Sequence, residues 1–304
     1  MKLTSKARLD GEMPMVITDL NGNIIHVNSK ARNALPTLRK GTSVSQYIDL
    51  DYLRKLSMLG NRMDTVEIKS HSFNCAILRV AGTGATRTVQ VYFMKTQGDT
   101  QEDFINNKML LASYGDVVNS GKYGVIRLAE LMPKIAEVLR NDLRFAYRKV
   151  EIAEYGIDGE LYVNFAHLAT IVTGTIAVLN EIEYRNPISI CIENMMGEYV
   201  LTVSVDVTTL KEGNGLLGFV ELYPKSAMRL MYITGICEND KIGYKLSIKP
   251  NGIKASYIIT EAVTKSKETG LSALTLDESA FIKRILELFT SDGIKSHTAD
   301  KKED

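Results

Sequence analysis

The sequence has no tryptophan, only three cysteines and only six prolines among its 304 residues. Cys75, Cys191 and Cys237 lie far apart along the chain, so they show neither the spacing of a metal site nor a disulfide framework. We expect each to be a small buried side chain. Unpaired cysteines are typical of a reducing compartment, and the predicted location is therefore cytoplasmic.

An excess of charge and a long apolar run are absent as well. There are 37 basic and 36 acidic side chains, for a net charge of +1, which favours neither a nucleic-acid partner nor an anionic membrane surface. No apolar run approaches the roughly 20 residues that span a bilayer. The first residues also lack the apolar stretch of a secretory signal. The length is typical of a two-domain protein.

The first part of the chain reads as β-rich. Two short runs, Met15–Leu20 and Asn23–Val27, flank Asn21-Gly22, a dipeptide that predicts a type I′ hairpin turn. Asn28 can then cap a short helix that ends at Leu35, before a proline. Three further strands are predicted over Val66–Ser70, Phe73–Val80 and Thr88–Met94.

The text PMVITDLNGNIIHVNSKARNAL resembles the opening of a PAS domain. The matching residues are Pro14, Asp19, Gly22, Ile24, Val27 and Asn28. The resemblance implies that residues 1–98 form a five-stranded antiparallel sheet with small helices between the second and third strands. It implies a module for self-association or for sensing a small ligand.

No PAS ligand is identified by the sequence. Cys75 stands beside an asparagine, as the photoreactive cysteine of flavin-binding PAS domains does, but the rest of that motif is missing, and a core cysteine is the preferred interpretation. His26 and His71 could be proposed as haem ligands. A surface or hydrogen-bonded histidine is the simpler interpretation of His26. A cofactor-bound redox or light sensor remains an alternative, and a coloured purified protein would indicate it.

Residues 99–124 are predicted to contain a connector helix. A PAS-containing kinase would next carry a two-helix dimerisation segment with a phosphoacceptor histidine. Here no histidine occurs between His71 and His167. Because His167 falls within a predicted core helix, it is a poor phosphoacceptor. This departure argues against an autophosphorylating kinase.

The most informative stretch is Phe165–Glu183. Asn164 is a good N-cap. The residues that follow recur at helical spacing and predict a helix with one apolar face: Leu168, Ile171, Val172, Thr175, Ile176, Leu179 and Ile182. The text LYVNFAHLATIVTGTIAVLNEI resembles the central helix of the histidine-kinase-type ATPase domain, the Bergerat fold.

This second resemblance implies that residues 125–263 form an α/β sandwich, a mixed sheet with helices on one face. Its first helix is predicted over Ile126–Lys149, and its closing hairpin is predicted to turn at Asn251-Gly252.

The nucleotide motifs of that family are where the sequence departs from it. Two asparagines on the central helix hold the magnesium of bound ATP, and their positions are occupied here by Gly174 and Val178. Neither side chain can bind a metal. The aspartate that binds adenine in the first glycine box has one candidate, Asp206, which can lie one position out of register, with Val205 in its place.

The glycines of that box are replaced by Thr208 and Leu210. Glycines at 213, 215 and 218 are a weak sign of a second glycine box, and a flexible loop explains them equally well.

The last segment, residues 264–304, is predicted to contain a helix that begins at a Thr275–Glu278 capping box and a disordered tail from Ser296. The apolar face of this helix suits packing onto the second domain, which we slightly prefer, or a dimer or partner interface.

The sequence thus predicts an α+β protein. We interpret it as a cytoplasmic regulator of bacterial, two-component-like signal transduction. Its ATPase-like domain would be a catalytically inactive pseudokinase that acts by protein interaction. The predicted partners are a second copy, bound through the PAS domain and the connector, and a signalling protein. No metal or cofactor is predicted, and ATP with magnesium belongs to the alternative: an active protein kinase, histidine-directed or serine-directed like the anti-sigma kinases.

Overall fold

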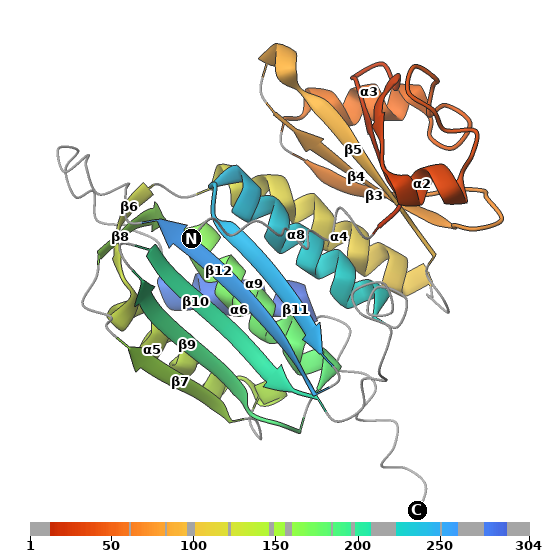
Figure 1. Cartoon of the computed structure of the whole chain (residues 1–304). Coiled ribbons are helices and arrows are strands. Elements are labelled where there is room, and N and C mark those ends of the chain that lie inside the picture. Colours follow the sequence, from red (N-terminus) through yellow and green to blue (C-terminus); the bar gives the residue numbers. More distant parts are fainter. Residues whose placement is uncertain are drawn as a thin grey trace, which may run out of the picture. The chain divides into compact units, whose positions relative to one another are not determined.

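The computed structural model describes residues 13–60, 62–82, 84–95, 101–120, 123–145, 149–155, 160–183, 185–195, 198–207, 223–249, 251–260 and 277–290. The chain divides into two compact units (Figure 1). Among the described residues, the N-terminal unit contains residues 13–119 and 223–225, and the C-terminal unit contains residues 120–207, 226–260 and 277–290. Both units combine helices with sheets, so the predicted α+β class is confirmed.

The N-terminal unit is built on a five-stranded antiparallel sheet, as predicted, and the order of its strands in space is β2-β1-β5-β4-β3. Two short helices lie between β2 and β3 in the sequence. The elements are β1 (Met15–Thr18), β2 (Ile24–Val27), α2 (Ser29–Ala34), α3 (Leu50–Met58), β3 (Met63–Glu67), β4 (Cys75–Ala81), the 3-10 turn η1 (Gly84–Thr86), β5 (Thr88–Met94) and the connector helix α4 (Gln101–Asn119).

One hydrophobic core holds this unit together. It joins strand residues, helix residues and the loops between them, with Leu38, Val44, Leu53, Leu78 and Val91 all fully buried. Alternate residues of a strand point to opposite faces, which is why every second residue of β4 and β5 contributes to this cluster. The predicted cap of α2 is confirmed, since Asn28 Oδ1 accepts a hydrogen bond from the amide of Ala31 (2.8 Å).

The predicted type I′ turn at Asn21-Gly22 is wrong. Of these two residues only Gly22 has a positive φ (+81°), whereas a type I′ turn requires it at both. The loop is instead ordered by Asp19, whose Oδ1 accepts hydrogen bonds from the amides of Asn21 (2.8 Å) and Asn23 (2.9 Å). A carboxylate two residues upstream thus decided the turn.

The strand predicted over Val66–Ser70 begins three residues earlier, at Met63, and ends at Glu67. Ser70 belongs to a turn, because its hydroxyl accepts a hydrogen bond from the amide of Phe73 (2.9 Å). Arg62 precedes β3 and connects the sheet to α4, donating to the carbonyl oxygen of Ala112 and to Asp116 (both 3.3 Å).

The C-terminal unit contains a mixed five-stranded sheet in the order β11-β12-β10-β9-β7, in which β7 is parallel to β9. Helices α5, α6 and α9 lie on one face of it (Figure 1). The elements are β6 (Tyr123–Arg127), α5 (Leu128–Asn141), the 3-10 turn η2 (Leu143–Phe145), β7 (Val150–Tyr155), β8 (Glu160–Asn164), α6 (Phe165–Ile182), β9 (Ile188–Met195), β10 (Glu198–Asp206), α8 (Pro224–Asn239), β11 (Gly243–Lys249), β12 (Gly252–Thr260) and α9 (Glu278–Thr290).

The helix predicted over Ile126–Lys149 is shorter than expected at both ends. Ile126 lies in β6, which forms a separate two-stranded sheet with β8, and α5 begins at Leu128. Strand pairing with a segment some 35 residues away overrides local helical spacing here. Pro133 lies inside α5.

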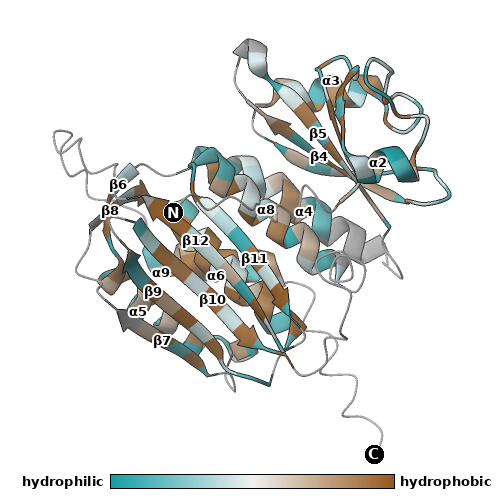
Figure 2. Cartoon of the chain, in the orientation of Figure 1, coloured by the Kyte–Doolittle hydropathy of each residue, from teal (hydrophilic) through white to brown (hydrophobic). Residues whose placement is uncertain are grey.

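Helix α6 is buried on nearly every side, not on one face as predicted. Sixteen of its 18 residues are buried, because the sheet covers one side and α5 and α9 cover others. Figure 2 shows the apolar colouring of α6 and of the strands in front of it. Among the described helices it alone is long and apolar enough to cross a membrane, and 89% of that stretch is buried inside the protein.

Two predicted turns and caps of this unit are also corrected. Lys249 pairs with Gly252, so Asn251-Gly252 is not the centre of the closing hairpin. At Gly252 a Cβ atom would lie 3.1 Å from the carbonyl oxygen of Val205, which explains a glycine at this position. The amide of Ala280 binds Asp277 Oδ1 (3.0 Å), so Asp277 caps α9; Thr275 lies outside the described residues.

The cysteine prediction holds in part. Cys75 and Cys237 are buried, but Cys191 is half-buried on β9.

Candidate functional site

The candidate site is the layer between α6 and α9, which contains Gly174, one of the two positions that correspond to the metal-binding asparagines of the resembled family. Asn164 starts α6 as predicted, with its Oδ1 accepting a hydrogen bond from the amide of Ala166 (2.9 Å). The two positions of interest, Gly174 and Val178, lie one turn apart in the second half of the helix and are fully buried.

Gly174 faces an aromatic ring. A Cβ atom built on it would lie 2.9 Å from Cε1 and 3.0 Å from Cζ of Phe289, and 3.2 Å from Cδ1 of Ile233. Contacts this short mean that the ring of Phe289 occupies the space a side chain would need at Gly174. The glycine therefore permits close approach of α9, and two apolar side chains surround the position where a metal-binding asparagine would stand.

Phe289 is itself held in place. Its ring packs edge-on against Tyr232 of α8, with the centroids 5.4 Å apart, and it is fully buried. Helix α9, which carries Phe289, is held by polar contacts at both ends. Glu278 forms an ion pair with Lys134 of α5, and Thr290 accepts a hydrogen bond from Arg144. Helix α9 is thus an integral part of this layer.

Asp206, the candidate for the adenine-binding aspartate, does not meet these residues. It is exposed at the end of β10, whereas Val205 beside it is 2% exposed. Helix α6 packs on β10, and the alternate residues Leu201, Val203 and Val205 of this strand are buried, so they share the face that the helix covers. Because successive residues of a strand point to opposite faces, Asp206 points to the other face of the sheet. Its backbone carbonyl accepts a hydrogen bond from Asn186 (2.7 Å).

The glycine boxes cannot be placed. Thr208, Leu210 and the glycines at 213, 215 and 218 lie outside the described residues. Among the residues that the structure describes, no three His, Cys, Asp or Glu side chains gather in a way that could hold a metal ion.

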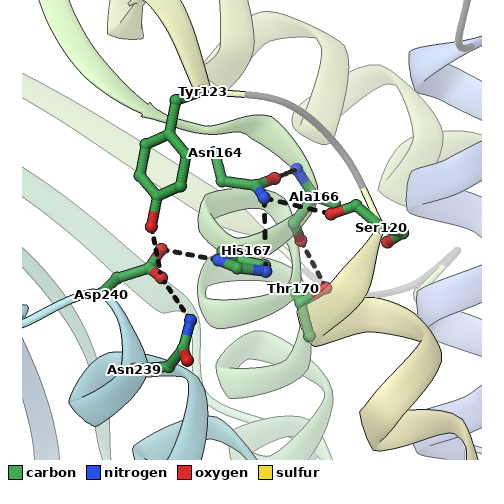
Figure 3. Close-up of polar contacts among 8 residues, drawn as sticks. All are labelled: Ser120, Tyr123, Asn164, Ala166, His167, Thr170, Asn239 and Asp240. Carbon is green, nitrogen blue, oxygen red and sulfur yellow. Dashed lines mark hydrogen bonds and ion pairs between the residues drawn. The ribbon is translucent and has the colours of Figure 1, made fainter. Parts of the chain in front are cut away.

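A polar cluster at the start of α6 was not identified from the sequence (Figure 3). His167, in the first turn, is 1% exposed, and its Nδ1 lies 2.6 Å from Oδ2 of Asp240, just after α8. The other carboxylate oxygen of Asp240 accepts hydrogen bonds from the hydroxyl of Tyr123 and the amide of Asn239 (both 2.9 Å). His167 and Asp240 are 73 residues apart, so no local pattern joins them.

Asn164 connects this cluster to the chain that follows α4. Since its Oδ1 caps α6, its Nδ2 amide is the donor, to the carbonyl oxygen of Ser120 (3.0 Å) and towards Nε2 of His167 (3.3 Å). We name the five residues Ser120, Tyr123, Asn164, His167 and Asp240 the polar cluster (Figure 3).

The ionisation of the cluster follows from these contacts. Burial by itself raises the pKa of Asp240, but the hydrogen bonds from His167, Tyr123 and Asn239 outweigh it and hold this pKa below its ordinary value. Burial, followed by the hydrogen bond to Asp240, raises the pKa of Tyr123 to about 12. Asp240 is therefore a buried carboxylate, and the hydrogen bonds from its donors are what keep it ionised.

Comparison with known proteins shows likeness in structure alone. No protein-family model and no curated protein matches the sequence. Similar solved structures include the histidine kinase AdeS of Acinetobacter baumannii, with a TM-score of 0.41 and 10% identity over 53% of this chain and 78% of that one. The histidine kinase ThkA in complex with the response regulator TrrA has a TM-score of 0.37 and 12% identity over 84% of this chain and 98% of that one.

The blue-light activated histidine kinase EL346 of Erythrobacter litoralis matches with a TM-score of 0.35 and 12% identity, over 84% of this chain and 98% of that one. At such low scores and identities, these likenesses carry no argument about activity.

Proposed function

We propose that the chain is a signal-transduction regulator whose C-terminal unit is a degenerate histidine-kinase-type ATPase module that acts by protein interaction. The observation that carries this proposal is the contact of Phe289 with Gly174. A kinase of this type needs side-chain ligands for magnesium, which neutralises the phosphates during transfer. At the corresponding positions this chain has a glycine covered by an aromatic ring and a buried valine.

The energetic argument against a nucleotide here is desolvation. Phosphates placed beside Gly174 and Val178 would lose water and gain no charged or hydrogen-bonding partner from these side chains, and burying charge in this way is very costly. Binding would also require α9 to leave, which would expose Phe289, Ile285 and the other buried residues of its inner face. Asp206, on the other face of the sheet, supplies no compensation.

We further propose that the N-terminal unit is the PAS module of this regulator. Its strand order, β2-β1-β5-β4-β3, with α2 and α3 between β2 and β3, supports the proposal. So does the agreement at Asp19, Gly22 and Asn28, each of which has a distinct structural role: ordering the first loop, taking the positive φ and capping α2.

Self-association through the PAS module and α4, in the cytoplasm of a bacterium, remains a prediction. The side chain of Met109 on α4 is among the exposed large hydrophobic residues, at 63% exposure, which favours a contact on this helix. Analytical ultracentrifugation of the full chain and of a Met109→Lys variant tests it: we expect a dimer that the variant weakens, and a monomeric wild type would contradict it.

The experiment that tests the pseudokinase proposal is calorimetric titration of the full chain with ATP and magnesium, with thermal stabilisation as a second readout. We expect neither heat nor stabilisation at millimolar ATP. A ligand that binds only the folded state raises the stability of the protein, so an unchanged stability indicates that ATP does not bind. The matched variant is Phe289→Ala, which opens the space beside Gly174 without restoring ligands. It should also fail to bind.

Two outcomes would change the conclusion. Micromolar binding by the wild type that is abolished by Asp206→Ala would overturn the pseudokinase and favour the active kinase, histidine- or serine-directed. Binding by Phe289→Ala alone would show that α9, and not the loss of ligands, excludes the nucleotide.

A further inference from the structure

The polar cluster joins four parts of the C-terminal unit at one point (Figure 3). Ser120 directly follows the connector helix α4, and Tyr123 is the first residue of β6. Asn164 and His167 stand at the start of α6, and Asp240 follows the last residue of α8. The chain that leaves the connector thus makes two hydrogen bonds to buried residues, one between Ser120 and Asn164 and one between Tyr123 and Asp240 at the end of α8.

The end of α8 is built against local preference. A carboxylate at a helix C-terminus faces the negative end of the helix dipole, where a cation is favoured. Yet Asp240 stands there, with its side chain only 4% exposed. The next residue, Lys241, has a φ of +57°, a left-handed conformation that is unfavourable for a side-chain-bearing residue and is usually taken by glycine.

The backbone of this helix end is nevertheless well ordered. The amide of Asp240 binds the carbonyl oxygen of Ile236 (3.0 Å), and that of Ile242 binds the carbonyl oxygen of Cys237 (2.8 Å). Two donors from distant parts of the chain, His167 and Tyr123, compensate the unfavourable acid, together with its neighbour Asn239. The conformation of the last turn of α8 therefore depends on groups that belong to the start of α6 and to the exit of the connector.

We propose that the polar cluster is a latch that couples the end of the connector helix to the last turn of α8. Displacement of Ser120 and Tyr123 withdraws the Tyr123 hydroxyl from Asp240 and the Ser120 carbonyl from Asn164, and the disfavoured helix end then loosens. The side chain of Asp240 is 4% exposed, whereas Tyr123 lies at the surface with 47% exposure. Withdrawal of the Tyr123 hydroxyl therefore takes a donor away from a buried carboxylate and leaves that carboxylate with an unmet hydrogen bond. Through the latch, a displacement of the residues that follow the connector changes the order of the last turn of α8. This coupling does not depend on whether the C-terminal unit binds a nucleotide.

The test is hydrogen–deuterium exchange of the full chain with Tyr123→Phe, which removes one hydroxyl and keeps the ring. Because the hydrogen bond is to a charged group, we expect the amides of residues 236–242 to exchange roughly tenfold faster. The amides of β9 and β10 should keep their rates. Tyr162→Phe is the matched control: Tyr162 stacks on Tyr123 with the ring centroids 6.0 Å apart, and its hydroxyl is not part of the cluster, so the end of α8 should not respond.

A second variant approaches the latch from the connector side. Asn164→Ser retains an oxygen that can cap α6 but removes the amide that binds Ser120 and His167. It should loosen the same amides of α8, and Tyr123→Phe should add little in an Asp240→Asn background, where the charged acceptor is already gone.

Unchanged exchange over residues 236–242 in both Tyr123→Phe and Asn164→Ser would overturn the proposal. So would an equal acceleration throughout the unit, which would mark the cluster as a general contributor to stability rather than a latch.

Discussion

Replacing Gly174 by alanine tests whether Phe289 really occupies the metal-binding position. In an open helix this change stabilises a protein, since alanine is favoured over glycine by about 1 kcal/mol. Here the added Cβ would lie 2.9 Å from the ring of Phe289, and that ring cannot swing away because Tyr232 packs against it. Overpacking a core costs about 1–3 kcal/mol. The steric cost exceeds the gain in helix propensity, so we expect Gly174→Ala to lower the free energy of unfolding by about 1 kcal/mol.

Urea unfolding followed by circular dichroism measures this difference. Gly124→Ala is the control, because a Cβ atom at Gly124 would meet nothing within 4 Å, and it should be close to neutral. Phe289→Leu removes ring atoms, so in that background Gly174→Ala should cost about 1 kcal/mol less than in the wild type. If Gly174→Ala stabilised the protein, Phe289 of α9 could not cover this position as described. The argument that its ring occupies the magnesium site would then be refuted.

Three further changes have expected outcomes. Phe289→Ala should lower the unfolding free energy by about 3–5 kcal/mol in urea titration, because it leaves a cavity between α6, α8 and α9; a loss under about 1 kcal/mol would contradict the burial of the ring. The pKa of Asp240 is lowered in the folded state, so this group contributes stability at neutral pH that is lost as the pH falls through its folded pKa. The wild type should therefore exceed Asp240→Asn in stability at about pH 7, and this difference should shrink as the pH falls below 3.8, the ordinary pKa of an aspartate; a difference that stays constant with pH would contradict this argument. Gly22→Ala should destabilise the N-terminal unit by roughly 1–2 kcal/mol in thermal unfolding, because the position has a φ of +81° and Leu50 occupies the space of a Cβ; a neutral effect would show that the loop relaxes freely.

Several elements of both units follow from local sequence alone. Apolar spacing located α6 to within one residue, and the strand predicted over Thr88–Met94 is β5. Asn28 and Asn164 were recognisable as caps, because an asparagine side chain satisfies a first-turn amide of its own helix. These features involve neighbours in the chain, and their physics is contained in a short window.

The missed features all depend on distant partners. Ile126 belongs to a strand because β8 pairs with it, and α6 is buried on every side because α9, about a hundred residues later, packs on it. For Asp206, alternation along β10 was visible in the sequence, but which face the helices cover was not.

The sequence by itself determined the absence of an asparagine at Gly174 and Val178, and hence of the side-chain ligands that a magnesium site needs. Only the tertiary structure decided what stands there instead: the ring of Phe289, brought by a helix from the end of the chain. It likewise decided that His167 meets Asp240 across 73 residues. The physical reason is that residue type sets which interactions are possible, whereas packing sets which atoms come close enough to make them.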